Sequence, residues 1–271
     1  MREAARLVSV GGMIKAIAHP TDFSPESMSA FAHALRLAVA TKSRLDLLHV
    51  SGPGRGRWQQ FPQVRKLLEQ WGLLPEGADT GDVLELTGVA VRKVEVADED
   101  AVDGLTGFLD THCPDLVVMA SHGRAGLDRL VKGSVSVDVT QSLGLPALLV
   151  GPRARPFVNL ETGVMALEKI LVPVARDPDP AKALTTLDAL NASLGAELDY
   201  LHVGEAPPAV TGVSVRTTGG PVVDAILTEA SRAQMIAMPT AGRNGLLDHL
   251  FGSTTERVLA EANVPLLALP V

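Results

Sequence analysis

Short, uninterrupted runs of apolar residues alternate along the chain with segments in which apolar positions recur every three or four residues. The runs are rich in Val, Ile and Leu, as at 116–120 (Leu-Val-Val-Met-Ala), which is typical of strands buried on both faces of a parallel sheet. The segment that begins with Ser24 and Pro25 has an N-cap residue and a proline suited to the first helical turn. It predicts a helix with one apolar face, formed by Met28, Phe31, Leu35 and Val39.

The same helical pattern returns later in the chain. It starts at Asp179 and Pro180, places Leu184, Leu187 and Leu194 on one face, and reaches a glycine stop at Gly195. A further helix precedes the fourth apolar run, with Asp98 as its expected N-cap. Alternating strands and helices predict parallel sheets with right-handed crossovers. We therefore expect an α/β fold of two tandem doubly wound Rossmann-like domains, each a five-stranded parallel sheet with helices on both faces in the order 3-2-1-4-5.

An internal repeat supports two domains. Residues 45–50 (Leu-Asp-Leu-Leu-His-Val) reappear at 198–203 (Leu-Asp-Tyr-Leu-His-Val), and residues 115–120 match 234–239. The spacing between copies falls from 153 residues in the early blocks to 119 in the late ones, so the first copy carries an inserted segment of about 34 residues, near 51–88. We expect domains at 1–153 and 164–271, with the second one shorter, joined by a linker at 151–163 that lacks clear periodicity.

The inserted segment holds both tryptophans, Trp58 and Trp71. Between them, apolar residues stand at helical spacing, namely Phe61, Val64, Leu67 and Leu68. This pattern favours a helix that packs on its own domain. A lid or a surface for a partner is the alternative.

Composition excludes several classes of protein. The 271 residues carry a net charge of −7, which argues against a nucleic-acid partner and weakly against an anionic membrane. The single cysteine excludes an intrachain disulfide and disfavours a structural zinc site. The N-terminal stretch has no apolar region of signal-peptide length, and no run approaches the roughly 20 apolar residues of a membrane helix. We expect a cytoplasmic protein.

Doubly wound sheets bind ligands beyond the carboxyl ends of their strands, at the point where strand order reverses. We place that point between the first and fourth strands, which singles out the loops that follow Pro20 and Ala120. Glycines and a helix N-terminus near Ser134 would offer backbone amides to an anion, and Asp22 could accept a hydrogen bond from a ribose hydroxyl or an amine. The alternative is that the glycines only shape turns and that Asp22 and Ser134 only cap helices. Neither a P-loop nor a Gly-x-Gly-x-x-Gly fingerprint is present.

At these residues the chain resembles the universal stress protein family, as a tandem member with two such domains. The resemblance is carried by 20–27 (Pro-Thr-Asp-Phe-Ser-Pro-Glu-Ser), 47–50 (Leu-Leu-His-Val) and 121–126 (Ser-His-Gly-Arg-Ala-Gly). The family's nucleotide motif is Gly-x-x-Gly, nine residues, then Gly-Ser or Gly-Thr. Here Gly123, nine residues and Gly133-Ser134 match this motif, with Ala120 in place of its first glycine.

The resemblance implies a role for each matching residue. The aspartate at the position of Asp22 contacts adenine in ATP-binding members, and the backbone around Val50 also faces the base. Met119 and Ala120 line the base and ribose, while residues from His122 onward surround the phosphates. The implied nucleotide-binding residues are Pro20, Thr21, Asp22, Val50, Met119, Ala120, His122, Gly123, Arg124, Gly126, Gly133, Ser134 and Val135. ATP is the implied ligand, and a requirement for Mg²⁺ is left open.

The second copy departs from the motif. It retains Gly242, Gly245, Gly252 and Ser253, which mark a weaker second site. Ala175 replaces the aspartate, and Pro239 replaces the motif's first glycine and removes a backbone N–H. We expect the nucleotide to be held mainly by the first half.

The function implied is that of a stress-response sensor or regulator that binds ATP or another adenine nucleotide. One alternative is a nucleotide-independent interaction or dimerisation module, which the replacements at Ala120, Ala175 and Pro239 favour. Another is a slow ATPase, but the loop offers no Walker-type lysine and no paired carboxylates, so no catalytic residue is assigned. His112 beside Cys113 is not a ligand set, and no metal site is predicted.

Assembly and histidine roles complete the expectations. Family members commonly dimerise through the last strand of the sheet, which corresponds to 145–150 and 264–269 here. A tandem chain can make this pairing internally, as a pseudo-dimer that hides two sheet edges. A homodimer of whole chains is left open.

We expect His49 and His202, at matching strand ends, to serve packing or a structural hydrogen bond, and His19 to make a local polar contact.

Overall fold

The computed structural model describes residues 14–52, 58–121, 144–240 and 253–271. The strands of the first half are β1 (Ala16–Pro20), β2 (Arg44–Ser51), β3 (Val91–Ala97), β4 (Leu116–Ala120) and β5 (Ala147–Val150). Its helices are α1 (Pro25–Thr41), η1 (Trp58–Gln60), α2 (Val64–Gln70), α3 (Thr80–Thr87) and α4 (Ala101–His112). The second half contains β6 (Lys169–Pro173), α6 (Ala181–Leu194), β7 (Glu197–Val203), β8 (Arg216–Thr218), α7 (Val222–Ala230), β9 (Met235–Thr240), α8 (Ser253–Glu261) and β10 (Leu266–Pro270).

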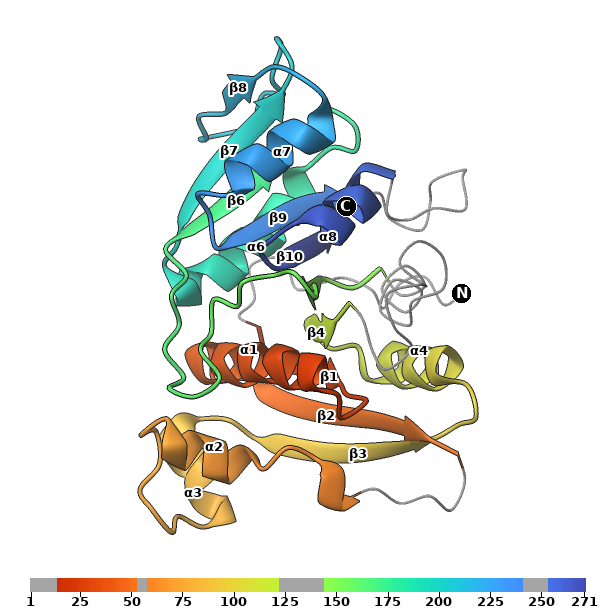
Figure 1. The fold of residues 1–271 in the computed structure, drawn as a ribbon, viewed down its shortest axis with the longest axis vertical. Coiled ribbons are helices and arrows are strands. Elements are labelled where there is room, and N and C mark those ends of the chain that lie inside the picture. The colour runs from red at the N-terminus through yellow and green to blue at the C-terminus, as the bar shows by residue number, and fades with distance from the viewer. Residues whose placement is uncertain (1–13, 53–57, 122–143, 241–252) are drawn as a thin grey trace.

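In the described part of the chain, ten strands form one sheet in the order β3-β2-β1-β4-β5-β10-β9-β6-β7-β8. Each half therefore has the order 3-2-1-4-5, and its strands pair in parallel, as predicted. The halves meet where β5 and β10 pair antiparallel, with Leu148 opposite Leu267. Figure 1 shows this junction in the middle of the molecule, with β3 and β8 at opposite ends. The predicted pairing of the two last strands within one chain is confirmed.

The ends of the helices follow their capping residues. Ser24 caps α1 and accepts a hydrogen bond from the Ser27 amide, and Gly195 ends α6 at a φ of 70°, both as predicted. The expectation for α4 is wrong by two residues, since its N-cap is Asp100, whose side chain accepts from the amides of the first turn. Asp98 lies two residues before the cap, where its amide still bonds Ser51 beside the pairing of β2 with β3 and its side chain accepts from the Asp100 amide at 3.0 Å.

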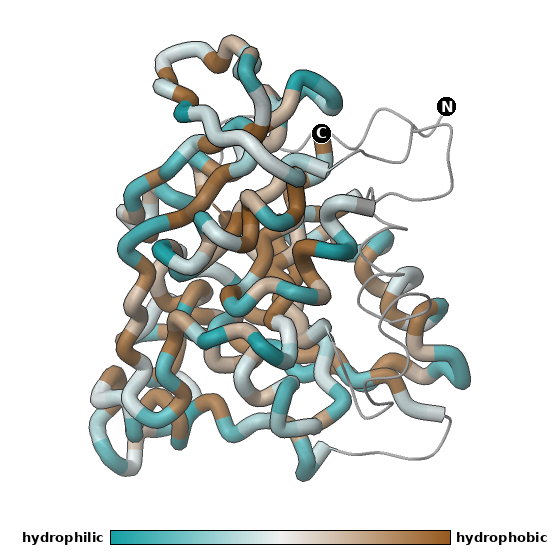
Figure 2. The backbone as a smooth tube through the Cα atoms, turned by 45° about the horizontal axis from the view of Figure 1, so that its top comes forward, coloured by the Kyte–Doolittle hydropathy of each residue, from teal (hydrophilic) through white to brown (hydrophobic). Residues whose placement is uncertain are grey.

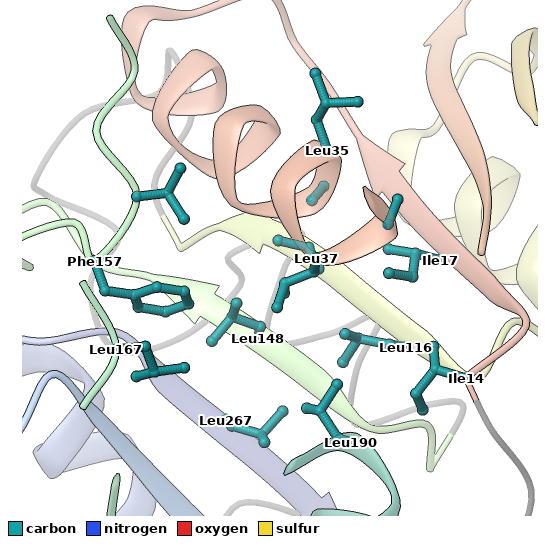
Figure 3. Packing of buried hydrophobic residues seen from close by; sticks show 14 of the residues in the cluster. Ile14, Ile17, Leu35, Leu37, Leu116, Leu148, Phe157, Leu167, Leu190 and Leu267 are labelled. Carbon is teal, nitrogen blue, oxygen red and sulfur yellow. The ribbon is translucent and has the colours of Figure 1, made fainter. Parts of the chain in front are cut away.

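The core has two layers, one on each face of the sheet. α1, α2, α3 and α6 contribute to one layer, and α4, α7 and α8 contribute to the other. Figure 2 shows hydrophobic segments concentrated in the middle of the molecule. Figure 3 shows Leu148 of β5 near Phe157 of the connection between the halves, and Leu267 of β10 near Leu190 of α6, all within one buried cluster. No helix within the described segments has the length and apolar character needed to cross a bilayer.

The connection between the halves, residues 151–168 and here called the strap, includes the predicted linker 151–163 and packs on the first half. Phe157 and Val158 are buried, and their amides donate to Nε2 of His33 on α1 at 3.2 and 3.4 Å. Nδ1 of His33 donates to the Ser29 carbonyl. Burial lowers the pKa of His33 to about 4, so the ring is neutral and Nε2 can accept. The strap turns back on itself between Val158 and Met165, which form an antiparallel bridge, and it contains no regular element that would give a periodic pattern.

The inserted segment lies on the α1 face and forms η1, α2 and α3. Phe61, Val64 and Leu68 are buried there, which confirms the expected helix on its own domain. Trp71 has a further contact that the sequence did not indicate, because its Nε1 donates to the Leu160 carbonyl of the strap at 2.9 Å. The inserted segment therefore fastens the connection between the two halves.

Candidate functional site

The switch point lies between β1 and β4, as expected from the sequence. β1 pairs with β2 along its whole length, but it pairs with β4 only as far as Ala18. At the next residue the His19 side chain replaces the backbone pairing with β4, because its Nδ1 donates to the Val118 carbonyl at 2.8 Å. The two strands separate there, so the loops after Pro20 and Ala120 begin at the same edge of the sheet.

His19 makes the polar contact that was predicted for it. Burial lowers its pKa to about 4, against the opposing effects of the Val118 carbonyl and the Asp22 charge. The ring is neutral with its proton on Nδ1, which leaves Nε2 as an acceptor. Among the described residues, Nε2 has no hydrogen-bond partner.

The loop after β1 is anchored through Thr21. The Thr21 amide donates to Leu48 at 2.8 Å, and its carbonyl accepts from Nδ1 of His49 at 2.8 Å. Its hydroxyl accepts from the Ser27 hydroxyl at 2.8 Å and from the Phe23 amide at 3.1 Å. Because each polar group of Thr21 is engaged, this loop is held to β2 and to α1. The structural interpretation of His49 is confirmed.

The Asp22 carboxylate is held by its own loop. Its Oδ1 accepts from the Ser24 amide at 3.0 Å and from the Ser24 hydroxyl at 2.6 Å. The structure therefore rejects the interpretation of Asp22 as the helix cap, since Ser24 has that role. A half-buried carboxylate with a fixed orientation at this edge can accept hydrogen bonds from an amine or a hydroxyl group of a ligand.

The other described candidates surround the same edge. Pro20 ends β1 and Ala120 ends β4, where Ala120 pairs with Val150. Val50 is half-buried and lies against Gly104 of α4. Met119 is buried in the core, so its side chain belongs to the packing of the domain and only its backbone can face the loop region.

The remaining candidates lie outside the described residues. In the first half these are His122, Gly123, Arg124, Gly126, Gly133, Ser134 and Val135, and in the second half Gly242, Gly245 and Gly252. Ser253 is the first residue of α8. The contribution of these residues stays a prediction.

The sequence did not indicate a group of aromatic rings beside the Asp22 loop, here called the aromatic cluster: Phe23, His49, Phe61 and Trp58. The Phe23 ring lies 4.2 Å from that of His49 and 5.4 Å from that of Phe61, between ring centroids. Trp58 lies 5.6 Å from Phe61 and is 56% exposed. The helical spacing of Phe61 places it on the core face of the inserted segment and contains no signal for a contact with the loop.

The second half repeats the backbone anchoring of this loop, but without a carboxylate at the position of Asp22. The Val174 amide donates to Leu201 at 2.8 Å, and Nδ1 of His202 donates to the Val174 carbonyl at 2.9 Å, which reproduces the anchoring of Thr21. The prediction of a structural hydrogen bond for His202 is confirmed. Ala175 follows at the position of Asp22 and has no polar side-chain atom, so the acceptor is missing at this position, and the next carboxylate of the loop is Asp177, two residues on.

An aspartate–arginine pair between neighbouring strands occurs in both halves and supports the duplication. Asp46 of β2 is buried and receives two hydrogen bonds of 2.9 Å from Arg92 of β3. Asp199 of β7 is bonded in the same two-pronged manner by Arg216 of β8, at 2.6 and 2.9 Å. The repeated aspartate in the two apolar runs is thus explained by sheet structure.

Comparisons with known proteins agree with the geometry. The sequence profile of the universal stress protein family matches residues 13–151 and 204–270. A universal stress protein of Methanocaldococcus jannaschii is 24% identical over 162 residues, which cover 51% of this chain and 82% of that protein. A universal stress protein of Mycolicibacterium smegmatis is 22% identical over 287 residues, which cover 92% of this chain and 94% of that protein.

Solved structures share the fold over nearly the whole chain. A universal stress protein from Archaeoglobus fulgidus DSM 4304 matches with a TM-score of 0.65 at 20% identity, covering 95% of this chain and 97% of that one. The cytoplasmic domain of a prokaryotic cation chloride cotransporter matches with a TM-score of 0.55 at 14% identity, covering 96% of each chain. The fold alone therefore does not decide the function.

Proposed function

Because the chain belongs to the universal stress protein family, we propose that its first half binds an adenine nucleotide, ATP in the first place, and that the protein is a stress-response sensor or regulator. One observation carries the proposal: the Asp22 carboxylate, held by Ser24, stands at the strand edge where β1 and β4 separate. The single cysteine and the family support a cytoplasmic location as part of the same proposal.

The residues of the first half fit a nucleotide in two parts. Asp22 is an acceptor, which suits the exocyclic amine of adenine or a ribose hydroxyl. The phosphate part rests on the motif from Gly123 to Ser134, whose backbone amides and hydroxyl would receive the negative charge. The sequence of this loop contains no Walker-type lysine and no paired carboxylates, so we propose that ATP turnover is slow or absent.

The second half would bind nucleotide weakly or not at all. Its loop keeps the backbone anchors of the first half, but it lacks the carboxylate at Ala175 and a backbone donor at Pro239. Its structural contribution is the antiparallel pairing of β10 with β5. We propose that this pairing takes the place of a contact between two separate chains.

A nucleotide-independent interaction module is the second candidate. The replacements at Ala120, Ala175 and Pro239 favour it. This candidate predicts a normally folded protein whose thermal stability does not change with ATP. A site filled at about 100 times its Kd would instead add roughly 2.7 kcal/mol to the free energy of unfolding.

Equilibrium dialysis with labelled ATP separates the two candidates. The native chain should bind ATP, and Asp22→Ala should weaken binding by about tenfold or more, because a buried base amine would lose its acceptor. Asp115→Asn is the matched control, since Asp115 accepts backbone amides of Lys15 and Ala16 and Gln234 performs the same task with an amide side chain in the second half. If native protein takes up no adenine nucleotide and none copurifies with it, the nucleotide proposal is wrong.

A further inference from the structure

Phe23, between Asp22 and Ser24, has a backbone conformation that phenylalanine seldom adopts. Its φ is 63°, in the left-handed region that favours glycine. A side chain in this region costs conformational free energy and persists only where the surrounding structure holds it. The contacts of the ring show what holds it here.

The Phe23 ring is fixed by two rings from different elements. His49 belongs to β2 and is itself tied to the loop through the Thr21 carbonyl. Phe61 belongs to the inserted segment, is only 2% exposed, and meets Phe23 in an edge-to-face arrangement. Behind Phe61 lie Trp58 and the Lys93 ammonium, the latter 5.9 Å from its ring. The inserted segment thus reaches the loop through Phe61.

The backbone conformation of Phe23 determines whether the Ser24 amide can reach the Asp22 carboxylate. The Phe23 amide donates to the Thr21 hydroxyl at 3.1 Å, and the Ser24 amide donates to Asp22 Oδ1 at 3.0 Å. The second of these bonds spans Phe23, the residue whose φ is positive. Relaxation of Phe23 to negative φ would turn the Ser24 amide away from Asp22, and the carboxylate would lose its orientation.

The second half supplies an internal comparison. At the same repeat spacing, Arg176 replaces Phe23 and Ala175 replaces Asp22. The crossover from β7 to β8, residues 204–215, contains no helix and no counterpart of Phe61. The first half thus has both the aromatic cluster and a carboxylate at the position of Asp22. The second half lacks counterparts of Phe23 and Phe61 and lacks a carboxylate at that position.

We propose that Phe23 is a positioning residue for the nucleotide site, and that the inserted segment sets the orientation of Asp22 by holding the Phe23 ring through Phe61. The inference rests on the proposed function and deepens it. Phe23 acts through Asp22, and its ring does not need to touch the nucleotide.

Two substitutions of Phe23 separate a positioning role from direct contact. Phe23→Ala removes the ring but leaves a side chain that disfavours positive φ, so ATP affinity should fall by about tenfold, equivalent to about 1.4 kcal/mol. Phe23→Gly also removes the ring, but glycine adopts positive φ without strain, so most of the lost affinity should return. Equal losses in the two variants would mean that the ring contacts the ligand itself or has no role in positioning, and the proposal would be overturned.

Phe61→Ala tests the link to the inserted segment. It should weaken ATP binding in the native background and have little effect in the Phe23→Gly background, where the ring is no longer needed. Val64→Ala is the matched control, because Val64 is a buried residue of the same segment outside the aromatic cluster. Melting curves of each variant show that it remains folded. A loss of affinity that Val64→Ala reproduces would overturn the link.

Hydrogen exchange tests the inference without any nucleotide. The Ser24 amide makes the bond that spans Phe23, so it should exchange faster in Phe61→Ala and Phe23→Ala than in the native chain, and faster than in Phe23→Gly. If the native chain binds no ATP, the proposed function fails while exchange still decides the role of Phe23. If the Ser24 amide exchanges in Phe61→Ala as in the native chain, the inference is wrong even when ATP binds.

Discussion

The strap between the halves can be loosened by adding one methyl group. Gly163 has a φ of +68°, and a Cβ built there would lie 2.4 Å from Cδ2 and 2.5 Å from Cγ of Trp71. The same glycine offers its carbonyl to Nε of Arg36 at 3.0 Å. Gly163→Ala therefore perturbs the point where the inserted segment, α1 and the strap meet.

The expected loss of stability has three parts. Alanine at positive φ costs about 1 kcal/mol. Displacement of the Trp71 ring from a filled site costs about 1–3 kcal/mol. The hydrogen bond from Trp71 Nε1 to Leu160, 2.9 Å long, would be lost with it and adds about 1 kcal/mol. Gly163→Ala should lower the free energy of unfolding by about 3–5 kcal/mol.

Urea denaturation followed by far-UV circular dichroism measures this loss. Gly195→Ala is the matched control because Gly195 has a φ of +70° and no atom within 4 Å of an added Cβ, so it isolates the backbone cost of about 1 kcal/mol. Adding Trp71→Ala to Gly163→Ala should remove the clash and give a total cost well below the sum of the two single effects. If Gly163→Ala costs no more than Gly195→Ala, the strap is not fastened by Trp71.

Two further predictions concern buried charge. His19 and His33 each have a pKa of about 4 when folded against 6.5 for the exposed group, so the unfolded chain binds more protons between these values. The free energy of unfolding should be highest above about pH 6.5 and fall towards pH 4 by about 1.4 kcal/mol per pH unit for each histidine. In urea denaturation at a series of pH values, His33→Gln should show about half this pH dependence, because one titrating histidine remains. Arg92→Met removes one cation that bonds the buried Asp46 and should lower the free energy of unfolding by about 2 kcal/mol. Arg65→Met, which removes an exposed ion pair, should lower it by less than about 0.5 kcal/mol. Similar losses for the two variants in denaturation curves would contradict this prediction.

Most of the fold could be predicted from the sequence because each element carries its own pattern. The apolar runs gave strands, the residues Ser24 and Gly195 marked helix ends, and the repeat required the same strand order twice. The location of the candidate site followed from parallel topology, since strands that run together end at one edge. Asp98 was misassigned because capping depends on where strand pairing stops, which the local sequence does not show.

The contacts of particular side chains could not be predicted in this way. Phe61 and Val64 both stand on the apolar face of the inserted segment, and their spacing does not show that Phe61 meets the Phe23 ring edge to face. The strap shows no periodicity, and its burial depends on His33 and Trp71 from distant parts of the chain. Periodicity says which face of an element is buried, and it does not say which residue of another element fills the space.

The sequence by itself determined that this chain is a duplicated doubly wound fold of the universal stress protein family, with a carboxylate at Asp22 in one copy and Ala175 in the other. Only the tertiary structure decided how that carboxylate is held, what keeps Phe23 at positive φ, and how tightly the two halves are joined. The physical reason is that local patterns record whether a residue is buried, whereas the orientation of a side chain depends on atoms that folding brings together from distant positions.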